Sequence, residues 1–254
     1  FGTISCFGAN AAKPHHRPGN DAGSAFANNS FYLVDAGGHY SDGTTDMTRT
    51  VAIGEITQQM RAYYTHVLKA NIALANNAFS PDATQQILGQ PGTHEMLDKA
   101  GLDKMPHGIG HGVGMFGCVH EFPPLISHKA PEKCLSPGMF FSNEPGCYVK
   151  GAYGIRIENL QHLYRVEDDF FELETVSLAP IDLHAVAPEM LTQQEIAWLN
   201  NYHDKVRAEL TAMIDPAQDA EFYNWLQAKT RPFHEQVREY QLDRPRSGTQ
   251  PSPA

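Results

Sequence analysis

The sequence predicts an α+β fold. Short apolar runs rich in β-branched residues, such as FYLVDAG (31–37) and TDMTRTVAIG (45–54), are typical of strands. Between residues 58 and 79, apolar residues recur at three-to-four spacing, which indicates a helix. The order of segments is strand, helix, helix and strand, without the regular alternation of a parallel βαβ sheet.

The N-terminal third is expected to hold a strand, a long loop and a hairpin. Residues 1–30 are rich in Gly, Asn, Ala, Pro and His, and FYLVDAG and TDMTRTVAIG then flank the turn residues of GGHYSDGT. Two strands joined in this way predict a β-hairpin. In such a hairpin Asp35 and Asp46 could face each other and converge on one ion.

Helices and strands alternate irregularly after the hairpin. The helix over residues 58–79 has Thr57 as N-cap and Pro81 just beyond its end. A second helix is expected over 82–100, whereas residues 105–124 contain too much Gly and His for a helix. MFFSNEP (139–145), YGIRIENLQHLYRV (153–166) and FFELETVSLAP (170–180) are predicted strands, and 192–213 and 216–230 predicted helices. The predicted units are residues 1–187, a C-terminal helical extension over 188–234 and a disordered polar tail over 235–254.

Composition narrows the class of protein. The net charge of −10, from 19 basic and 29 acidic residues, argues against nucleic acid or an anionic membrane as the main partner. No apolar stretch is long enough to span a bilayer, and FGTISCFGAN lacks the pattern of a signal peptide. Four irregularly spaced cysteines are expected to be reduced thiols, so we expect a cytoplasmic protein. The chain lacks an initiator Met and is expected to be a processed or truncated piece.

Five residues form the ligand set that a two-metal hydrolase needs: Asp35, Asp46, His111, Glu144 and Glu158. Taken singly, each residue is weak evidence for a metal site, because an Asp beside a turn, for example, is usually a turn former. Three of the carboxylates, however, stand at the end of or within apolar strand segments. Charges there are rarely tolerated unless they are paired or bind metal, so a salt-bridged carboxylate is the alternative. Two divalent ions would neutralise the four clustered carboxylates.

The histidines lie in a glycine-rich segment, HGIGHGVGMFGCVHE, which contains His107, His111 and His120. A helical pairing of His107 with His111 fails because the interspersed glycines disfavour helix. Glycine instead lets the backbone approach a ligand or another strand closely. His120 is far enough along the chain to serve as an acid or base rather than a ligand. One nitrogen among carboxylate oxygens suits Mn²⁺ better than a thiolate-rich zinc site, with Zn²⁺ or Co²⁺ as alternatives.

These motifs together resemble the pita-bread metallopeptidases, the family of methionine aminopeptidase, prolidase and aminopeptidase P. Within that family the sequence is most similar to the catalytic domain of cytosolic-type Xaa-Pro aminopeptidases. The resemblance runs from about residue 4 to 233 and rests on DAGGHYSDGTTDMTRT, HGIGHGVGMFGCVHE, SNEPGCY, YGIRIENL and WLNNYH. It implies the pita-bread (creatinase/aminopeptidase) fold, in which a curved, largely antiparallel sheet is flanked by helices. Relatives of this type carry N-terminal domains and opening helices of the catalytic domain that are expected to be missing here.

The resemblance also implies a role for each site residue. Asp35 would hold one metal, Asp46 and Glu158 would bridge both, and His111 and Glu144 would bind the other. Glu144 would also shuttle a proton.

The remaining roles concern the substrate. His120 would bond the scissile carbonyl or leaving group, His107 would shape the substrate site, and His15 would lie near the proline side. Arg156 would orient ligands, with a structural salt bridge as the alternative. One departure from the family is Phe122, which replaces a more usual glycine after Glu121.

The implied activity is a metal-dependent exopeptidase that releases the N-terminal residue of peptides with proline second, through a hydroxide activated by two ions. A prolidase-type dipeptidase is the rival within the family, and a non-catalytic metal-binding module of the same fold is the rival outside it. An interaction domain severed from its catalytic context is a third alternative. The partner would be a peptide substrate, and the C-terminal helices resemble a segment that supports dimers, so a homodimer stays open.

Overall fold

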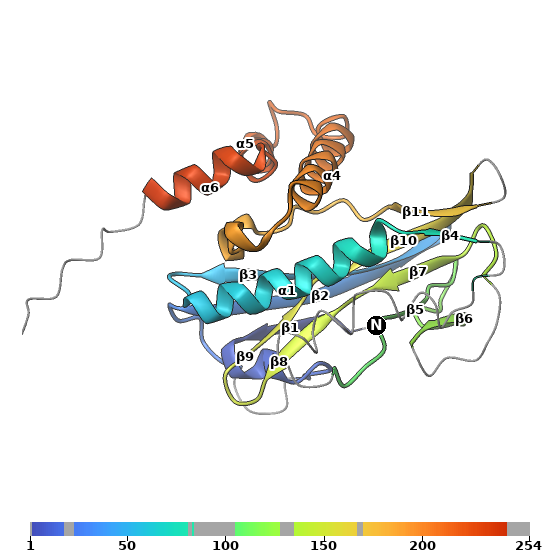
Figure 1. Ribbon diagram of the computed structural model, residues 1–254, viewed down its shortest axis with the longest axis horizontal. Helices are drawn as coiled ribbons and strands as arrows, with labels where there is room; N and C mark the ends of the chain where they lie inside the picture. Colours follow the sequence, from blue (N-terminus) through green and yellow to red (C-terminus); the bar gives the residue numbers. More distant parts are fainter. Residues whose placement is uncertain are drawn as a thin grey trace, which may run out of the picture.

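The computed structural model describes residues 2–17, 23–80, 83, 105–127, 135–166 and 170–242, and its strands form antiparallel sheets (Figure 1). The first sheet has the order β1 (Ile4–Phe7), β2 (Ser30–Tyr40), β3 (Gly43–Ile53). The second has the order β4 (Ala78–Phe79), β11 (Phe171–Thr175), β10 (Asn159–Arg165), β7 (Phe140–Asn143), β5 (Gly110–Gly112), β6 (Glu121–Ile126). The third pairs β8 (Gly146–Val149) with β9 (Tyr153–Arg156). The predicted α+β class is confirmed.

The predicted hairpin forms, with a register that corrects one expectation. β2 and β3 pair along their whole length across a two-residue turn. Asp35 lies opposite Thr48, and Asp46 lies opposite Gly37. The two aspartates are therefore diagonal neighbours on one face of the hairpin rather than direct partners, because alternate residues of a strand point the same way.

Two predicted elements end earlier than the sequence suggests. The helix α1 (Gln58–Ala75) begins at Thr57, whose side chain accepts a hydrogen bond from the Met60 amide, but it stops four residues before Phe79. The Asn77 side chain donates to the Ala73 carbonyl at 2.7 Å, and the chain then forms β4 against β11. The predicted strand over 153–166 is likewise split into β9 and β10, and Glu158 lies at the break. The helix predicted over 82–100 lies outside the described residues.

The C-terminal helices follow two 3-10 turns, η3 (Leu183–Ala185) and η4 (Pro188–Met190). α4 (Gln193–Thr211) and α5 (Ala220–Lys229) match the predicted helices, and Thr192 with Glu195 forms a capping box at the start of α4. A further helix, α6 (Phe233–Leu242), occupies the first residues of the predicted polar tail. Its repeat places Phe233 and Val237 against the core, so helical order extends to residue 242 and corrects the boundary at 235. The rest of that tail lies outside the described residues.

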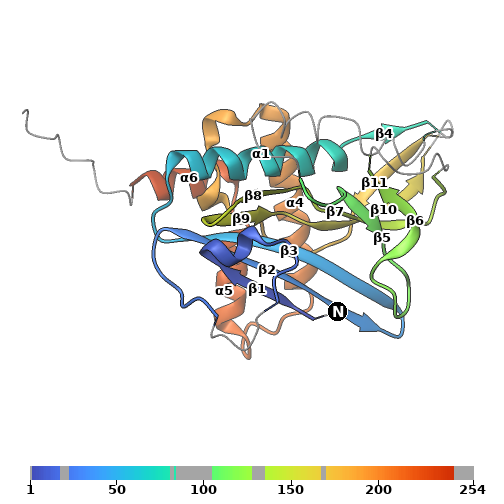
Figure 2. The same ribbon diagram turned by 90° about the horizontal axis from the view of Figure 1, so that it is seen from below.

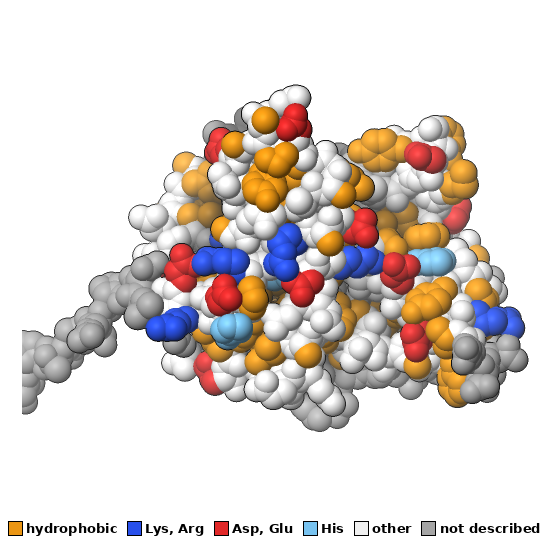
Figure 3. All heavy atoms as spheres, turned by 90° about the horizontal axis from the view of Figure 1, so that it is seen from above, with side chains coloured by type: hydrophobic (Ala, Val, Ile, Leu, Met, Phe, Trp, Pro, Cys, Tyr) orange, Lys and Arg blue, Asp and Glu red, His pale blue; other side chains and the backbone are white. Residues whose placement is uncertain are grey.

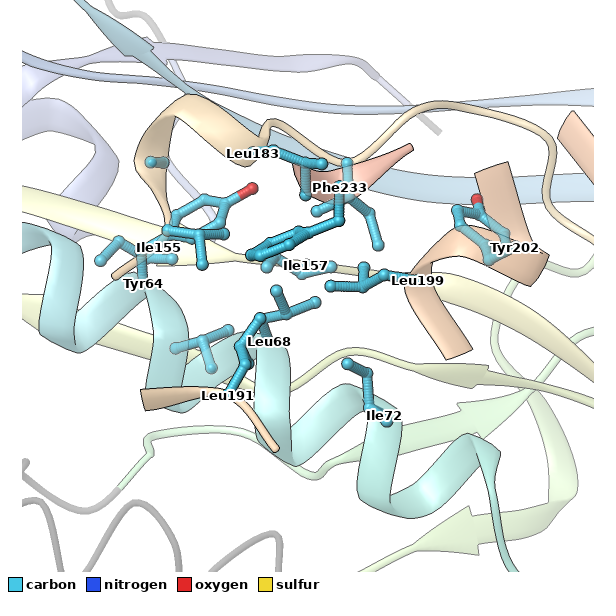
Figure 4. Close-up of a cluster of buried hydrophobic side chains, with 14 of the residues drawn as sticks. Tyr64, Leu68, Ile72, Ile155, Ile157, Leu183, Leu191, Leu199, Tyr202 and Phe233 are labelled. Carbon is cyan, nitrogen blue, oxygen red and sulfur yellow. The ribbon is translucent and has the colours of Figure 1, made fainter. Parts of the chain in front are cut away.

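The main core lies between α1, the strands and the C-terminal helices. In Figure 4, Tyr64, Leu68 and Ile72 of α1 point toward Ile155 and Ile157. Side chains of α4 and the segments flanking it close the other side of this cluster: Leu183, Leu191, Leu199, Tyr202 and Phe233. Figure 2 shows α1 running along one side of the strands, with the β1–β3 sheet below it. The C-terminal helices are thus part of the same apolar core as the strands that carry the site.

The face in Figure 3 is mixed in charge: acidic and basic side chains lie next to one another in a band across its middle. One such pair joins α1 to α4, where Lys69 Nζ lies 2.7 Å from Glu195 Oε1. None of the helices in the described residues is both long and apolar enough to cross a bilayer.

Candidate metal centre

The five predicted ligands come from separate elements that meet in one place. Asp35 and Asp46 lie on β2 and β3, and His111 lies on β5. Glu144 directly follows β7, and Glu158 lies between β9 and β10. All five line a single cavity of about 320 Å³. The tertiary structure therefore brings these five residues together at one cavity, as their chemistry in the sequence led us to expect.

Three of the five form a group tight enough to hold one ion. Ligand atoms of Asp46, His111 and Glu158 all lie within 4.8 Å of one another, and the three residues are buried. Glu144 stands beside this group, with its Oε1 3.3 Å from His111 Nε2. Asp35 lies outside the group of three and contacts Arg156 instead.

Arg156 connects Asp35 to Glu158 through a threonine. Its Nη2 donates to Asp35 Oδ2 at 2.6 Å, and its Nε donates to Thr48 Oγ1 at 3.0 Å. The Thr48 hydroxyl in turn donates to Glu158 Oε2 at 2.6 Å. The sequence left two alternatives for Arg156, a structural salt bridge or a role in orienting ligands. The structure contains both contacts: the ion pair with Asp35 and the hydrogen bond to Thr48, which in turn bonds Glu158.

His111 presents a lone pair to the carboxylates. Its Nδ1 lies 3.0 Å from the Gly112 carbonyl, which can only accept, so Nδ1 carries the proton. Nε2 then has no proton when the ring is neutral, and burial lowers the pKa of His111 to about 4. Yet Nε2 lies 3.5 Å from Asp46 Oδ2 and 3.3 Å from Glu144 Oε1. A nitrogen and two oxygens that face one another as acceptors need a cation or proton between them.

The carboxyl groups are unfavourable as a cluster of charges. Burial raises the pKa values of Asp46, Glu144 and Glu158 above their ordinary range, and neighbouring carboxylates raise them further. Asp35 Oδ1 is buried and has no hydrogen-bond partner within the described part of the chain. An orphaned carboxylate oxygen beside a cluster of hard oxygen donors and one imidazole fits divalent cations.

Glycine makes the close packing of β5 possible. A Cβ at Gly110 would lie 1.8 Å from the Ser142 carbonyl oxygen, and one at Gly112 would lie 2.2 Å from the Glu121 carbonyl oxygen. Any side chain there would push β5 away from β7 or β6 and move His111. The glycine-rich segment therefore lets β5, which carries His111, pack closely between β7 and β6, as expected for glycine.

The residues predicted to contact substrate line the same cavity: His15, His107, His120 and Arg156. The His120 ring stands edge-on to the His111 ring, with centroids 4.2 Å apart. Phe122 also lines the cavity although 61% of its surface is exposed, so it forms part of the mouth. Arg17, which sequence reasoning missed, lines it as well.

His107 is held in one tautomer. Its Nδ1 donates to the Gly108 carbonyl at 2.7 Å, and its Nε2 accepts from the Tyr148 hydroxyl at 2.7 Å. Arg156 Nη1 donates to the same hydroxyl at 2.8 Å, which leaves its proton for His107. Burial lowers the pKa of His107 to about 4, so the ring is neutral near pH 7.

Sequence reasoning missed the polar residues that support the ligands. Asn71 of α1 donates to the Asn143 and Ile157 carbonyls, at 2.8 and 3.1 Å, and each of these residues immediately precedes a proposed glutamate ligand. Ser142 donates to Glu144 Oε1 at 3.1 Å and accepts from the His111 amide. Asn71 interrupts the apolar face of its helix, and that break in the pattern is the signal that could have identified it.

Comparisons with known proteins agree with this geometry. The model of metallopeptidase family M24 matches residues 1–164, and that of the C-terminal region of peptidase M24 matches residues 169–233. A probable Xaa-Pro aminopeptidase P from Tuber melanosporum is 39% identical over 242 residues, which cover 92% of this chain and 38% of that protein.

Two solved structures are also similar. X-prolyl aminopeptidase from Caenorhabditis elegans, described as a cytosolic enzyme with a di-nuclear active site, has a TM-score of 0.85 at 36% identity, over 91% of this chain and 38% of that one. Prolidase from Thermococcus sibiricus has a TM-score of 0.60 at 28% identity, over 72% and 47%. The chain thus spans less than half the length of each of these proteins.

Proposed function

The chain belongs to metallopeptidase family M24, and on that premise we propose that it is the catalytic part of an Xaa-Pro aminopeptidase. It would release the N-terminal residue from peptides that have proline at the second position. The pita-bread fold that the motifs indicate is confirmed by the family and by the similar solved structures. Residues 1–187 would form the catalytic unit, and residues 188–234 its helical extension.

One observation carries this proposal: the five ligand candidates and the four substrate candidates line the same cavity. The relatives named above support the choice of reaction, since both an Xaa-Pro aminopeptidase P and an X-prolyl aminopeptidase match more than nine tenths of this chain. The supporting network of Arg156, Thr48 and Tyr148 gives the ligands fixed orientations, as metal sites require.

Two divalent ions would be held by Asp35, Asp46, His111, Glu144 and Glu158, with Mn²⁺ favoured by the oxygen-rich donor set and Zn²⁺ or Co²⁺ as alternatives. When bound, such ions lower the pKa of a shared water and stabilise negative charge on the scissile carbonyl oxygen. Asp46 and Glu158 would contribute buried carboxylate oxygens, and Asp35 would contribute Oδ1, because Arg156 donates only to its Oδ2.

The side chains of the cavity would then divide the remaining work. Burial raises the pKa of Glu144, whose side chain is 17% exposed toward the cavity, so it can hold a proton and pass it to the departing proline nitrogen. His120 would donate to the scissile carbonyl or the leaving group. His107, neutral and fixed by Tyr148, would shape the substrate site, and His15 would lie at its proline side.

Replacing His120 by alanine is expected to lower kcat by roughly 10²–10⁴-fold, because a positioned acid or base typically contributes that much. Metal content should be unchanged, since His120 stands edge-on to the proposed ligand His111 and is not itself among the proposed ligands. Metal analysis and kinetics of the purified variant check this, with His234→Ala, an exposed histidine on α6, as the matched control. Loss of metal from His120→Ala would make His120 a ligand.

The substrate proposal is tested by comparing Arg-Pro-Pro with Arg-Pro as substrates in the presence of Mn²⁺. An Xaa-Pro aminopeptidase is expected to release Arg from the tripeptide with a higher kcat/KM than from the dipeptide. Glu158→Gln, purified in parallel, serves as the control for contaminating peptidases. Cleavage of the dipeptide alone would overturn the proposal in favour of a prolidase-type dipeptidase, the second candidate that the likeness to prolidase favours.

The non-catalytic alternative, a metal-binding module of the same fold, has a separate test. It predicts less than one equivalent of bound metal after addition of Mn²⁺, together with no activity that EDTA removes. The proposed enzyme requires both activity and its loss in EDTA.

We place the protein in the cytoplasm by analogy with the cytosolic Caenorhabditis elegans enzyme, and a homodimer through the C-terminal helices remains part of the proposal.

A further inference from the structure

Arg49 lies directly behind the proposed metal centre. It follows Thr48 on β3 and is buried, with 7% of its surface exposed. Its Nη1 donates to the Glu158 carbonyl at 2.6 Å and to the Thr48 carbonyl at 2.9 Å. Glu158 thus lines the cavity of the proposed metal centre while its backbone is held by Arg49. A shift of this guanidinium would move both Glu158 and the threonine that orients it.

The other half of the guanidinium depends on acceptors from distant parts of the chain. Nη2 donates to Asn159 Oδ1 at 2.6 Å, to the Ala179 carbonyl at 2.9 Å and to the Tyr202 hydroxyl at 2.8 Å. The hydrogen-bond partners of Arg49 in the described residues are carbonyl, amide and hydroxyl oxygens, none of them a carboxylate. A buried charge held in this way relies on each acceptor being in place.

Tyr202 brings the C-terminal helix α4 into this network. It is 5% exposed, and its ring stacks on Trp198 with centroids 5.3 Å apart. Its hydroxyl accepts from Arg49 and can give its proton to any of three oxygens: the Ala179 carbonyl at 2.8 Å, the Ser177 carbonyl at 3.1 Å and Asn159 Oδ1 at 3.3 Å. Figure 4 shows the Tyr202 side chain on α4 at one end of the main apolar cluster. The ring is therefore anchored by packing, and the hydroxyl lies where Arg49 can donate to it.

We propose that Tyr202 is a positioning residue for the metal centre: its hydroxyl fixes Arg49, and Arg49 fixes the backbone of Glu158. The helical extension would then set the divalent-cation affinity of a site to which it contributes no ligand. The inference rests on the metal centre proposed above. It goes beyond that proposal because it assigns α4 a role in metal binding in addition to covering the core.

A purely structural role for the hydroxyl makes a different prediction. Loss of a buried hydrogen bond would then lower the stability of the metal-free and metal-loaded proteins equally, and the dissociation constant for metal would not change. A positioning role lowers the stability of the loaded protein more, because the ligands are no longer held in the binding geometry. The dissociation constant for Mn²⁺ therefore separates the two roles.

The experiment titrates the EDTA-treated full chain with Mn²⁺, following the free ion by electron paramagnetic resonance. Tyr202→Phe keeps the ring and its stacking on Trp198 but removes the hydroxyl. We expect its Mn²⁺ dissociation constant to rise by roughly 10-fold, the lower end of the effects seen for residues that orient ligands. Tyr164→Phe is the matched control, since its hydroxyl bonds Glu172 on the exposed side of β10 and β11. Its affinity should equal that of the wild type.

A second variant, Arg49→Lys, keeps a positive charge but loses the fork that reaches Asn159, Ala179 and Tyr202. We expect at least as large a rise in the dissociation constant. The double variant should bind only about as weakly as Arg49→Lys alone, because the two residues act through one network. The inference would be overturned if the effects of the two substitutions on the dissociation constant multiplied in the double variant. It would also be overturned if Tyr202→Phe bound Mn²⁺ with wild-type affinity. If the wild type itself bound no Mn²⁺, the proposed function would fail instead.

Discussion

Replacing Glu158 by glutamine is expected to abolish turnover and to weaken binding of divalent cations. Glu158 is 1% exposed and belongs to the group of three candidate ligands whose ligand atoms lie within 4.8 Å of one another. The change removes one of the negative charges proposed to hold the ions while keeping the size of the side chain. Because metal ions supply several kcal/mol of transition-state stabilisation, a loss of about 10³-fold or more in kcat is expected.

The folded structure should survive this substitution. Burial raises the pKa of Glu158, so the metal-free protein already favours a neutral side chain at this position. We therefore expect metal-free Glu158→Gln to be at least as stable as metal-free wild type in urea. Glu172→Gln, on the exposed part of β11, is the matched control and should retain both activity and metal. Wild-type rates with full metal content in Glu158→Gln would remove Glu158 from the site.

Metal-free protein is expected to lose stability as the pH rises from about 7 to about 9, whereas metal-loaded protein is not. Burial raises the pKa of Asp46 to about 9 and that of Glu158 to about 7. In this window the folded state keeps protons that the unfolded chain has released. A state that binds more protons is favoured at lower pH, so the free energy of unfolding falls as pH rises.

The window is chosen to separate two opposite effects. His107 and His111 have pKa values lowered to about 4, so they stabilise the folded protein as pH rises toward their ordinary value of 6.5. Above that value they contribute no further change. The remaining slope belongs to the carboxyl groups, up to about 1.4 kcal/mol per pH unit for each proton retained.

Urea unfolding of EDTA-treated and Mn²⁺-loaded protein at several pH values measures the two slopes. Bound cations require deprotonated ligands, so loading removes the retained protons and metal affinity itself should rise with pH. Asp46→Asn lacks one titrating group and should show a shallower slope when metal-free. Equal slopes with and without Mn²⁺ would mean that these carboxyl groups do not bind the ions.

The candidate ligands stand out in the sequence because they break local patterns. Asp35 follows an apolar run of the sequence, and Glu158 interrupts another, so each is conspicuous within a few residues of its own position. The same local reasoning located the hairpin, α1 and α4, whose caps and periodicity lie within the segments themselves. Local reasoning failed where pairing with a distant strand determines the secondary structure. Phe79, for example, continues the helical pattern of α1 but lies in β4, which pairs with β11.

The supporting residues could not be predicted in this way. Thr48 looks like an ordinary strand threonine, yet it bonds Glu158 across 110 positions of sequence. Tyr202 looks like one more apolar position of an amphipathic helix, yet its hydroxyl meets Arg49 across 153 positions. A common polar residue carries no local mark of such a role, because its partner is defined only when the chain has folded.

The sequence by itself therefore determined the elements and the donor atoms available for metal. Only the tertiary structure decided which of those atoms lie together, that Asp35 and Asp46 are diagonal rather than opposed, and that Arg156 binds one oxygen of Asp35 and leaves the other. It also decided the protonation of the site, since burial and neighbouring charge shift the pKa values of its carboxyl groups and histidines. Residue chemistry is a local property, whereas distance, burial and charge environment arise only from packing.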